Sequence, residues 1–303
     1  MKIALTGARG RLGRSLRKHL EEEGHEVVAF SRTTDPSHKP LGVLPSLVRN
    51  GGWHAILHLG WSTLPATAEL SPGIEFENDL PFLSAVIRCP STQIPNSEEL
   101  PLLIFFSTGA VYGEMKPHQL PFMEGDPICP IGWYAKGKAA AEELIRNAER
   151  TALPAAILRI TNVYGVPDAT ASKQGVIPAI AKAVVDGVPL QIWGDGTAVK
   201  DYLHVRDLCT AVDAVLQKRL TGTFNVASGH SFSLTDILQI AQLHLGKNIV
   251  TSCHHAPAWD VQRAKYSNFK LRNATGWFPV VDFEDGLAET LGLWATRERF
   301  TPK

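Results

Sequence analysis

The sequence predicts an α/β protein with a Rossmann-type doubly wound parallel sheet and a smaller mixed α/β C-terminal substrate domain. Two observations predict this fold. Residues 2–6 form an apolar run that leads into a glycine turn, a helical pattern to Gly24 and a second apolar run at 27–30. Further apolar runs then alternate with helical patterns as far as residue 165, which is typical of parallel sheets. We expect a dinucleotide-binding domain over 1–165, joined by a strand near 222–228, and a mostly substrate-binding domain over 166–303.

The first turn contains Gly7, Gly10 and Gly13, spaced G-x-x-G-x-x-G. Glycines let the backbone turn tightly and approach a pyrophosphate, whose charge then lies at the N-terminus of the following helix. An ordinary glycine turn is the alternative. The position between a strand and a helix favours dinucleotide binding.

The residues after the second strand are expected to distinguish NAD from NADP. An acidic residue there would bind the ribose hydroxyls of NAD, but the sequence has Ser31 and Arg32, and the first acid is Asp35. Arg32, together with Arg9, is suited to a 2′-phosphate. NADP is therefore slightly favoured over NAD, with a solvated loop arginine as the alternative reading of Arg32.

The middle of the first domain is irregular before it becomes regular again. Residues 33–52 are too short and too rich in Pro and Gly for a full strand–helix unit. A buried-strand pattern is expected at 55–61, where His58 reads as a core histidine rather than a catalyst. A helix at 76–88 and a polar loop at 90–101 follow. The apolar strand at 102–106 ends in Ser107 and Thr108, which places hydroxyls where open α/β sheets bind ligands.

Tyr134 and Lys138 are four residues apart in a segment of strong helix formers. A helix that begins near Trp133 puts both side chains on one face. A phenol has a pKa of about 10, and a nearby cation lowers it towards the range of a useful base. A surface helix with an amphipathic tyrosine is the alternative when this spacing is taken alone.

In the second half of the sequence, the spacing of the expected strands and helices changes. Strands are expected at 155–160, 190–193, 201–205 and 223–227, and helices at 175–186, 207–218, 234–245 and 284–296. The last of these strands is the one expected to return to the main sheet.

Composition excludes several classes of function. Lys plus Arg and Asp plus Glu both total 30, so no bulk charge attracts nucleic acid or a membrane. Neither a secretory leader nor an apolar span is visible, and the four cysteines are scattered as free thiols, so a cytoplasmic protein is expected. The pair His254–His255 lacks a third ligand at suitable spacing, and no metal site is expected.

Several motifs together resemble the extended short-chain dehydrogenase/reductases, and more narrowly their NAD-dependent nucleotide-sugar epimerase/dehydratase branch. The matching motifs run in order along the chain: Thr6-Gly7-x-x-Gly10-x-x-Gly13, Ser107-Thr108-x-x-Val111-Tyr112-Gly113, Tyr134-x-x-x-Lys138, Arg159-x-x-Asn162-x-Tyr164-Gly165, Lys200-Asp201-Tyr202-x-His204 and Gly276-Trp277-x-Pro279.

The resemblance implies a role for each matching residue. Tyr134 is the expected acid/base, Lys138 holds the nicotinamide ribose and lowers the tyrosine pKa, and Thr108 hydrogen-bonds the substrate oxygen. The substrate is expected to contact Thr108, Asn162, Lys200 and Arg263. The residues expected to bind the cofactor are Gly7, Arg9, Gly10, Arg11, Leu12, Gly13, Ser31, Arg32, Leu59, Gly60, Trp61, Asn78, Ser107, Tyr134, Lys138 and Ile160.

The resemblance also narrows the reaction. Dehydratases of this branch carry an Asp-Glu pair after the catalytic threonine, and the residues here are Gly109 and Ala110. Small residues there resemble the epimerases, in which a keto intermediate needs room to turn. We expect epimerisation of a nucleotide-sugar at C4, through a keto intermediate. The alternatives are an NADPH-dependent reductase of a keto-sugar and, in a different class, a non-catalytic cofactor-sensing protein.

Two departures concern the diphosphate. The family usually has arginine where Lys200 stands, and lysine lacks the bidentate fork. A second usual arginine is missing from residues 254–259, where Arg263 is the available substitute. The resemblance further implies a homodimer paired through the helices at about 76–88 and 133–148.

Overall fold

The structure is a computed structural model that describes residues 1–32, 36–88, 100–148, 153–166 and 175–298. Asp35, Cys89 and most of the loop expected at 90–101 lie outside these residues.

The central feature is a seven-stranded sheet, counted over the described residues, with the order β10-β6-β5-β4-β1-β2-β3. All of its strand pairs are parallel. The order reverses between β1 and β4, which confirms the doubly wound fold. The strands are β1 (Lys2–Thr6), β2 (Glu26–Ser31), β3 (Lys39–Pro40), β4 (Ala55–His58), β5 (Leu102–Thr108), β6 (Ala155–Ile160) and β10 (Gly222–Val226).

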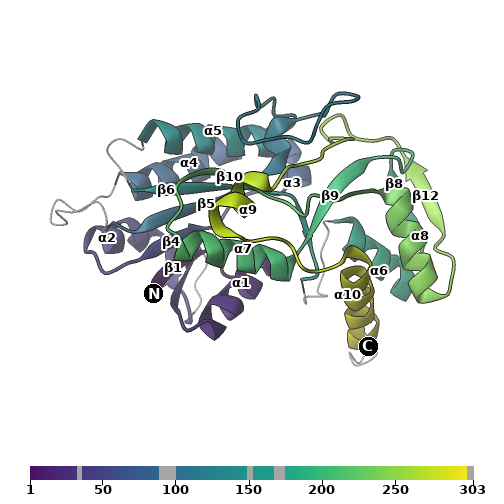
Figure 1. The fold of residues 1–303 in the computed structure, drawn as a ribbon, viewed down its shortest axis with the longest axis horizontal. Helices are drawn as coiled ribbons and strands as arrows, with labels where there is room; N and C mark the ends of the chain where they lie inside the picture. The colour runs from purple at the N-terminus through teal and green to yellow at the C-terminus, as the bar shows by residue number, and fades with distance from the viewer. Residues whose placement is uncertain (33–35, 89–99, 149–152, 167–174, 299–303) are drawn as a thin grey trace.

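Helices cover both faces of this sheet (Figure 1). One face packs against α2 (Leu44–Arg49), α4 (Ile74–Ile87) and α5 (Trp133–Ala148), with α3 (Pro65–Leu70) against α5. The other face packs against α1 (Arg11–Glu22) and α7 (Val205–Gln217). The irregular stretch at 33–52 contains only short elements among its described residues: β3, the 3-10 turn η1 (Leu41–Val43) and α2.

A smaller lobe extends from the carboxyl edge of the sheet. Its strands form two small sheets, and its helices α6, α8 and α10 enclose a separate apolar core (Figure 1). The elements are β7 (Asn162–Tyr164), α6 (Val176–Asp186), β8 (Leu190–Trp193), β9 (Val199–His204), β11 (Ser231–Ser233), α8 (Leu234–Leu245), β12 (Thr251–His254) and α10 (Phe283–Glu298).

The chain passes between the two lobes more than once. Helix α7, strand β10 and helix α9 (Phe269–Thr275) return to the large lobe, where their apolar side chains join the core of the main sheet. Near residue 165, where the domain division is expected, the chain leaves the large lobe for the first time. Part of residues 166–303 then packs against the large lobe again. Strand β10 pairs with β6 and so lies in the main sheet.

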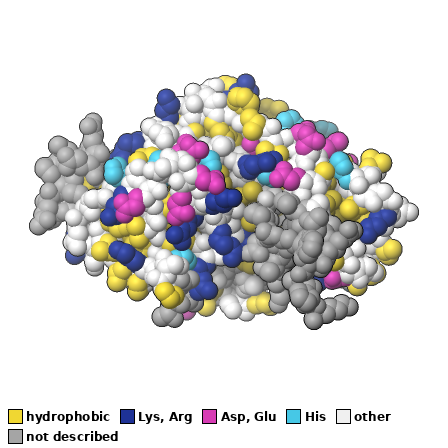
Figure 2. Space-filling model, turned by 90° about the horizontal axis from the view of Figure 1, so that it is seen from below, with side chains coloured by type: hydrophobic (Ala, Val, Ile, Leu, Met, Phe, Trp, Pro, Cys, Tyr) yellow, Lys and Arg dark blue, Asp and Glu magenta, His cyan; other side chains and the backbone are white. Residues whose placement is uncertain are grey.

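The surface carries both signs of charge. Figure 2 shows basic and acidic side chains interspersed on the face that it presents, in keeping with the formal net charge of zero. Among the described residues, helices that combine the length and the apolar character of a membrane span are absent.

Candidate active site

The expected cofactor residues lie mainly at one edge of the sheet. Strands β1, β2, β4, β5 and β6 run parallel, so their carboxyl ends meet at the same edge. Each of the five strands is followed or ended there by residues expected to bind the cofactor. These residues are Gly7, Arg9, Gly10, Arg11, Leu12, Gly13, Ser31, Arg32, Leu59, Gly60, Trp61, Ser107 and Ile160.

The glycine turn is tightly packed. Gly7 has φ of +72°, a left-handed conformation that favours glycine. A Cβ on Gly7 would lie 2.7 Å from the backbone nitrogen of Gly60, and one on Gly13 would overlap the carbonyl oxygen of Gly7. Helix α1 begins directly after Gly10 and has no acidic residue in its first turn. This cradle fits an anionic pyrophosphate at a helix N-terminus.

Arg32 is held by protein partners. Its guanidinium forms an ion pair with the buried carboxylate of Asp79 and donates to the hydroxyl of Ser62 at 2.5 Å. The backbone nitrogen of Ser62 donates to the other oxygen of Asp79 at 3.1 Å. Arg32 follows β2 and its side chain is 45 % exposed, as in the reading of a solvated loop residue, but its guanidinium is paired. A 2′-phosphate would have to compete with Asp79.

Helix α5 begins at Trp133, as expected, and brings Tyr134 and Lys138 to the ends of β4 and β5. The backbone nitrogen of Trp133 donates to Glu69 at 2.6 Å, which fixes the start of the helix. The Nζ atom of Lys138 donates to the carbonyl oxygen of Phe106 at 2.7 Å and lies 3.9 Å from the ring centroid of Trp61. It also lies 5.9 Å from the ring centroid of Tyr134. The two side chains therefore share one site.

Burial opposes the charge on both groups. Lys138 is 2 % exposed, and desolvation lowers its pKa to about 7 although Asp79, Glu142 and Glu75 act in the other direction. Desolvation, followed by the charge of Glu75, raises the pKa of Tyr134 to about 12. Tyr134 thus keeps its proton in the protein alone, and it needs added positive charge nearby to act as a base.

Glu75 is a site residue that the sequence reading missed. It is 0 % exposed, accepts a short hydrogen bond from Thr63 and packs against Gly137, between Tyr134 and Lys138 in α5. Glu75 and Asp79 occupy successive turns of the face of α4 that also buries Leu83. A helical period drawn back from Leu83 would have found both carboxylates. Asn78, the expected cofactor residue of this helix, is exposed and lies outside that face.

Three buried polar atoms around Lys138 have no hydrogen-bond partner within the part of the chain that the structure describes. They are Nε2 of His58, Nε1 of Trp61 and Oε2 of Glu75. His58 is a core residue, since its Nδ1 lies 2.8 Å from the hydroxyl oxygen of Thr6, and burial lowers its pKa to about 3. Buried polar atoms normally have partners. This set therefore fits a polar ligand such as a nicotinamide ribose.

Ser107 and Thr108, at the end of β5, face different partners. The hydroxyl of Ser107 donates to the buried carboxylate of Glu142 at 2.5 Å, and Arg159 donates to the same carboxylate at 2.7 Å. The side chain of Ser107 is therefore part of the buried support of the sheet. The hydroxyl oxygen of Thr108 accepts from the backbone nitrogen of Ala110 at 3.2 Å, which leaves its proton for a substrate oxygen.

Gly109 does not provide open room beside Thr108. A Cβ on Gly109 would lie 2.6 Å from Cζ of Tyr266. The expectation that a small residue leaves space for an intermediate to turn is wrong at this position, because the ring of Tyr266 occupies that space. A motif-based reading could not find this contact, since Tyr266 lies far along the chain and outside the matching motifs.

The expected substrate residues of the smaller lobe come together on its three-stranded sheet. Asn162 in β7 pairs with Tyr202 in β9, and its side chain donates to the carbonyl oxygen of Asp201 at 2.9 Å. Lys200 forms an ion pair with Asp260 at 2.6 Å, with both side chains partly exposed. The backbone of Arg263 forms a bridge to Val199, and its side chain is exposed.

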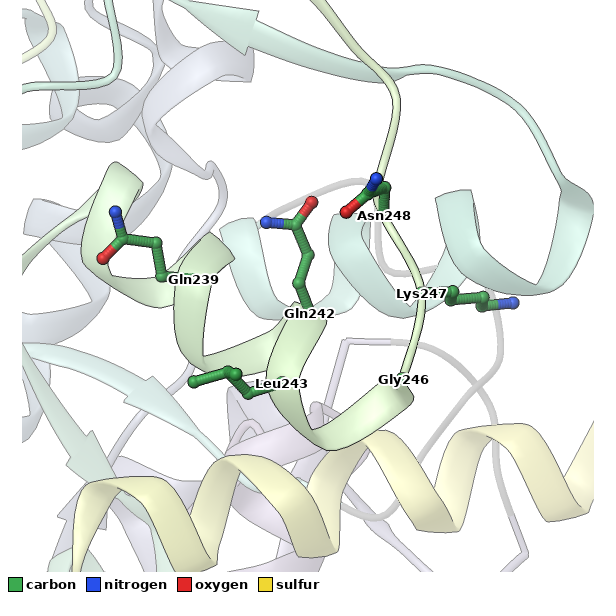
Figure 3. Close-up of a pocket in the computed structure, with 6 residues that line it drawn as sticks. All are labelled: Gln239, Gln242, Leu243, Gly246, Lys247 and Asn248. Carbon is green, nitrogen blue, oxygen red and sulfur yellow. The ribbon is translucent and has the colours of Figure 1, made fainter.

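Two other features lie apart from this site. Groups of three or more possible metal ligands are absent from the described residues, and His254 packs beside Trp193 with ring centroids 5.1 Å apart. A surface pocket on α8 of the smaller lobe is lined by Gln239, Gln242, Leu243, Gly246, Lys247 and Asn248 (Figure 3). It contains none of the residues discussed above.

Known proteins provide an independent comparison. The UDP-glucose 4-epimerase of Lacticaseibacillus casei is 28% identical over 97% of this chain and 96% of its own length. The dTDP-4-dehydro-6-deoxyglucose reductase of Escherichia coli is 26% identical over 94% of this chain and 95% of its own. A crystal structure of the Thermus thermophilus UDP-glucose 4-epimerase complex with NAD matches with a TM-score of 0.84 and 25% identity, covering 97% of this chain and 99% of that one.

The family assignment rests on most of the chain. The family described as the NAD dependent epimerase/dehydratase family matches residues 3–227. This span includes the glycine turn, Thr108, Tyr134, Lys138 and the strands of the main sheet except Lys2, the first residue of β1. The resemblance drawn from the motifs is confirmed: this chain belongs to the NAD dependent epimerase/dehydratase family.

Proposed function

We propose that this protein is a nucleotide-sugar 4-epimerase that oxidises a sugar hydroxyl to a keto group and then reduces it from the opposite face. The observation that carries the proposal is that Lys138 shares one site with Tyr134 and binds Phe106 of β5, the strand that Thr108 ends. The second lobe carries Asn162 and Lys200. The similarity to UDP-glucose 4-epimerases over nearly the whole chain supports it.

NAD is the cofactor that we favour. The fork of Arg32 is already engaged by Asp79 and Ser62, so a 2′-phosphate would have to displace a buried carboxylate. The glycine turn would hold the pyrophosphate, and Lys138 with Glu75 and Trp61 would surround the nicotinamide ribose. When bound, NAD supplies the hydride acceptor and donor and brings a positive charge near Tyr134.

The protein residues transfer the proton and bind the substrate. Thr108 donates to the oxygen of the reacting carbon, and Tyr134 accepts the proton from that hydroxyl during oxidation. Tyr134 returns the same proton during reduction. Lys138, held by the carbonyl oxygen of Phe106, lowers the tyrosine pKa when it is charged, because a cation favours the phenolate. Asn162, Lys200 and Arg263 bind the nucleotide end.

The reductase is the second candidate. The similarity to dTDP-4-dehydro-6-deoxyglucose reductase over 94% of the chain favours it. It would use the same Tyr134 to protonate the carbonyl oxygen, but it would consume one reduced cofactor in each turnover. Elimination of water is disfavoured, because acids do not follow Thr108 and the ring of Tyr266 fills the space at Gly109.

One experiment separates the two candidates. The purified protein is denatured to identify the released cofactor, and the intact protein is incubated with nucleotide-sugars in deuterated water. An epimerase gives a stereoisomer with no net change in cofactor and no deuterium at the reacting carbon. Stoichiometric consumption of NADPH would overturn the epimerase and favour the reductase.

We also propose that the protein forms a homodimer through α4 and α5. These two helices pack side by side on one face of the sheet, and α4 exposes Phe76. Light scattering on the purified protein measures its molar mass and tests this arrangement. A Phe76→Glu variant should have a molar mass closer to that of the monomer.

A further inference from the structure

A single extended stretch, residues 260–267, connects the smaller lobe to the rim of the main site, and we name it the crossing segment. At its start Asp260 pairs with Lys200, and Ala264 donates through its backbone nitrogen to the carbonyl oxygen of Val199 at 3.0 Å. At its end Tyr266 forms a bridge with Phe122 of the large lobe. The segment therefore contacts both lobes.

Tyr266 is the large buried residue of this segment. It is 6 % exposed and packs beside Tyr112 and Phe122, with ring centroids 5.9 and 6.1 Å away. Across the described residues, its hydroxyl has no hydrogen-bond partner. Burial, with Asp201 nearby, raises the pKa of Tyr266, so the hydroxyl remains a donor. This hydroxyl oxygen is not one of the fully buried polar atoms without a partner, so its tip remains open to a ligand that offers an acceptor.

The position of this hydroxyl relative to Thr108 indicates what that ligand is. Gly109 follows Thr108 directly, and a Cβ on Gly109 would lie 2.6 Å from Cζ and 2.8 Å from the hydroxyl oxygen of Tyr266. Only glycine lets the phenol come so close to the backbone. The unpaired hydroxyl therefore lies beside the residue that is expected to bind the reacting oxygen.

We propose that Tyr266 is a specificity-determining residue: its ring limits the room beside Thr108, and its hydroxyl binds a sugar hydroxyl next to the reacting carbon. The proposal rests on the proposed function, because it assumes a sugar at Thr108. It assigns to one residue both a steric limit and a polar contact, and the two can be tested separately.

The polar contact is tested with a Tyr266→Phe variant and single-deoxy analogues of the nucleotide-sugar that the wild type epimerises fastest. One neutral hydrogen bond contributes up to about 1.5 kcal/mol. We expect the wild type to lose up to about 10-fold in kcat/KM on one analogue. On the parent sugar, the kcat/KM of Tyr266→Phe should be lower than that of the wild type by the same factor. On that analogue, the kcat/KM values of Tyr266→Phe and the wild type should be equal.

Tyr112→Phe is the matched control. The hydroxyl of Tyr112 lies in the same aromatic cluster but already donates to Asn225 at 2.8 Å. This variant should lower the melting temperature and leave the ratio between parent sugar and analogue unchanged. Tyr266→Phe keeps the ring against Gly109 and removes only an unpaired hydroxyl, so its melting temperature should equal that of the wild type.

The steric limit is tested with the pair Gly109→Ala and Tyr266→Ala. Gly109→Ala should reduce kcat/KM because its Cβ pushes the ring of Tyr266, and the double variant should recover part of that loss. The proposal would be overturned if the ratio of kcat/KM on the parent sugar to kcat/KM on the analogue were the same in the wild type and in Tyr266→Phe for every analogue. It would also be overturned if the double variant recovered none of the lost kcat/KM. Neither result would contradict the epimerase activity. A wild type that epimerises no nucleotide-sugar would overturn the proposed function as well.

Discussion

The two sides of the candidate site are held in different ways. On the large lobe, Lys138, Glu75 and Glu142 are buried, and Arg159 donates to Glu142 within the protein interior. On the smaller lobe, the corresponding ion pair between Lys200 and Asp260 is partly exposed, and Arg263 is open to solvent. The buried side has its geometry before any ligand arrives, as acid–base chemistry requires. The exposed side has charges that can adjust to a substrate.

The largest effect is expected for Tyr134→Phe. Loss of the acid/base should lower kcat by about 10³-fold, while the cofactor content of the purified protein stays unchanged. Stopped or continuous assay of the stereoisomer, with the absorbance of the bound cofactor, measures both. Full turnover in this variant would show that the buried side of the site does not carry the proton transfer.

The next effect concerns stability. Arg159→Met leaves the buried carboxylate of Glu142 without its main partner and should lower the free energy of unfolding by about 3 kcal/mol. Arg146→Met is the matched control, since Arg146 binds the same carboxylate at 3.0 Å but is partly exposed, and it should cost less than about 1 kcal/mol. Urea denaturation measures both. Equal losses would remove the distinction between buried and exposed ion pairs.

A smaller effect is a dependence of stability on pH. The pKa of Lys138 is lowered from 10.5 to about 7, so between these values the unfolded chain binds more protons than the folded protein. The contribution of Lys138 to stability is complete above pH 10.5 and is lost as pH falls towards 7. Lys138→Met should therefore flatten the rise in stability between about pH 7 and 9.5.

Lys136→Met is the control for this measurement, because Lys136 belongs to the same helix but is exposed. Its unfolding curves should follow the slope of the wild type. An unchanged slope in Lys138→Met would mean that Lys138 is not desolvated in the folded protein.

The smallest effect is expected on the exposed side. Lys200→Met should raise KM for the nucleotide-sugar by about 10-fold, the effect of roughly 1.4 kcal/mol, and leave kcat nearly unchanged. Its free energy of unfolding should change by less than about 1 kcal/mol, because the pair with Asp260 is partly exposed. A fall in kcat equal to that of Tyr134→Phe would show that acid–base chemistry and substrate binding are not separated between the two lobes.

The same contrast explains what could be predicted from the sequence. The strand–turn–helix at 2–22 and the Tyr134–Lys138 pair are local patterns, because a few neighbouring residues determine turn, helix face and spacing. The ion pair of Arg32 was not predicted because its partner Asp79 lies in α4, far along the chain. Tyr266 was missed for the same reason, since it acts on Gly109, which is distant in sequence. The buried face of α4 could have identified Glu75 as a buried residue, but not its contact with Gly137. Contacts between residues distant in sequence cannot be inferred from local periodicity.

Strand β10 has a consequence for how the chain folds during synthesis. One edge of β6 pairs with β5, and within the part of the chain that the structure describes the other edge pairs with residues 222–226 alone, which are made long after β6 itself. Until they leave the ribosome, a nascent chain ending near residue 165 presents an open strand edge, the kind of surface that pairs with other chains. A truncation at that point should aggregate when expressed alone, and the large lobe should reach its final form only after much of the smaller lobe has been synthesised.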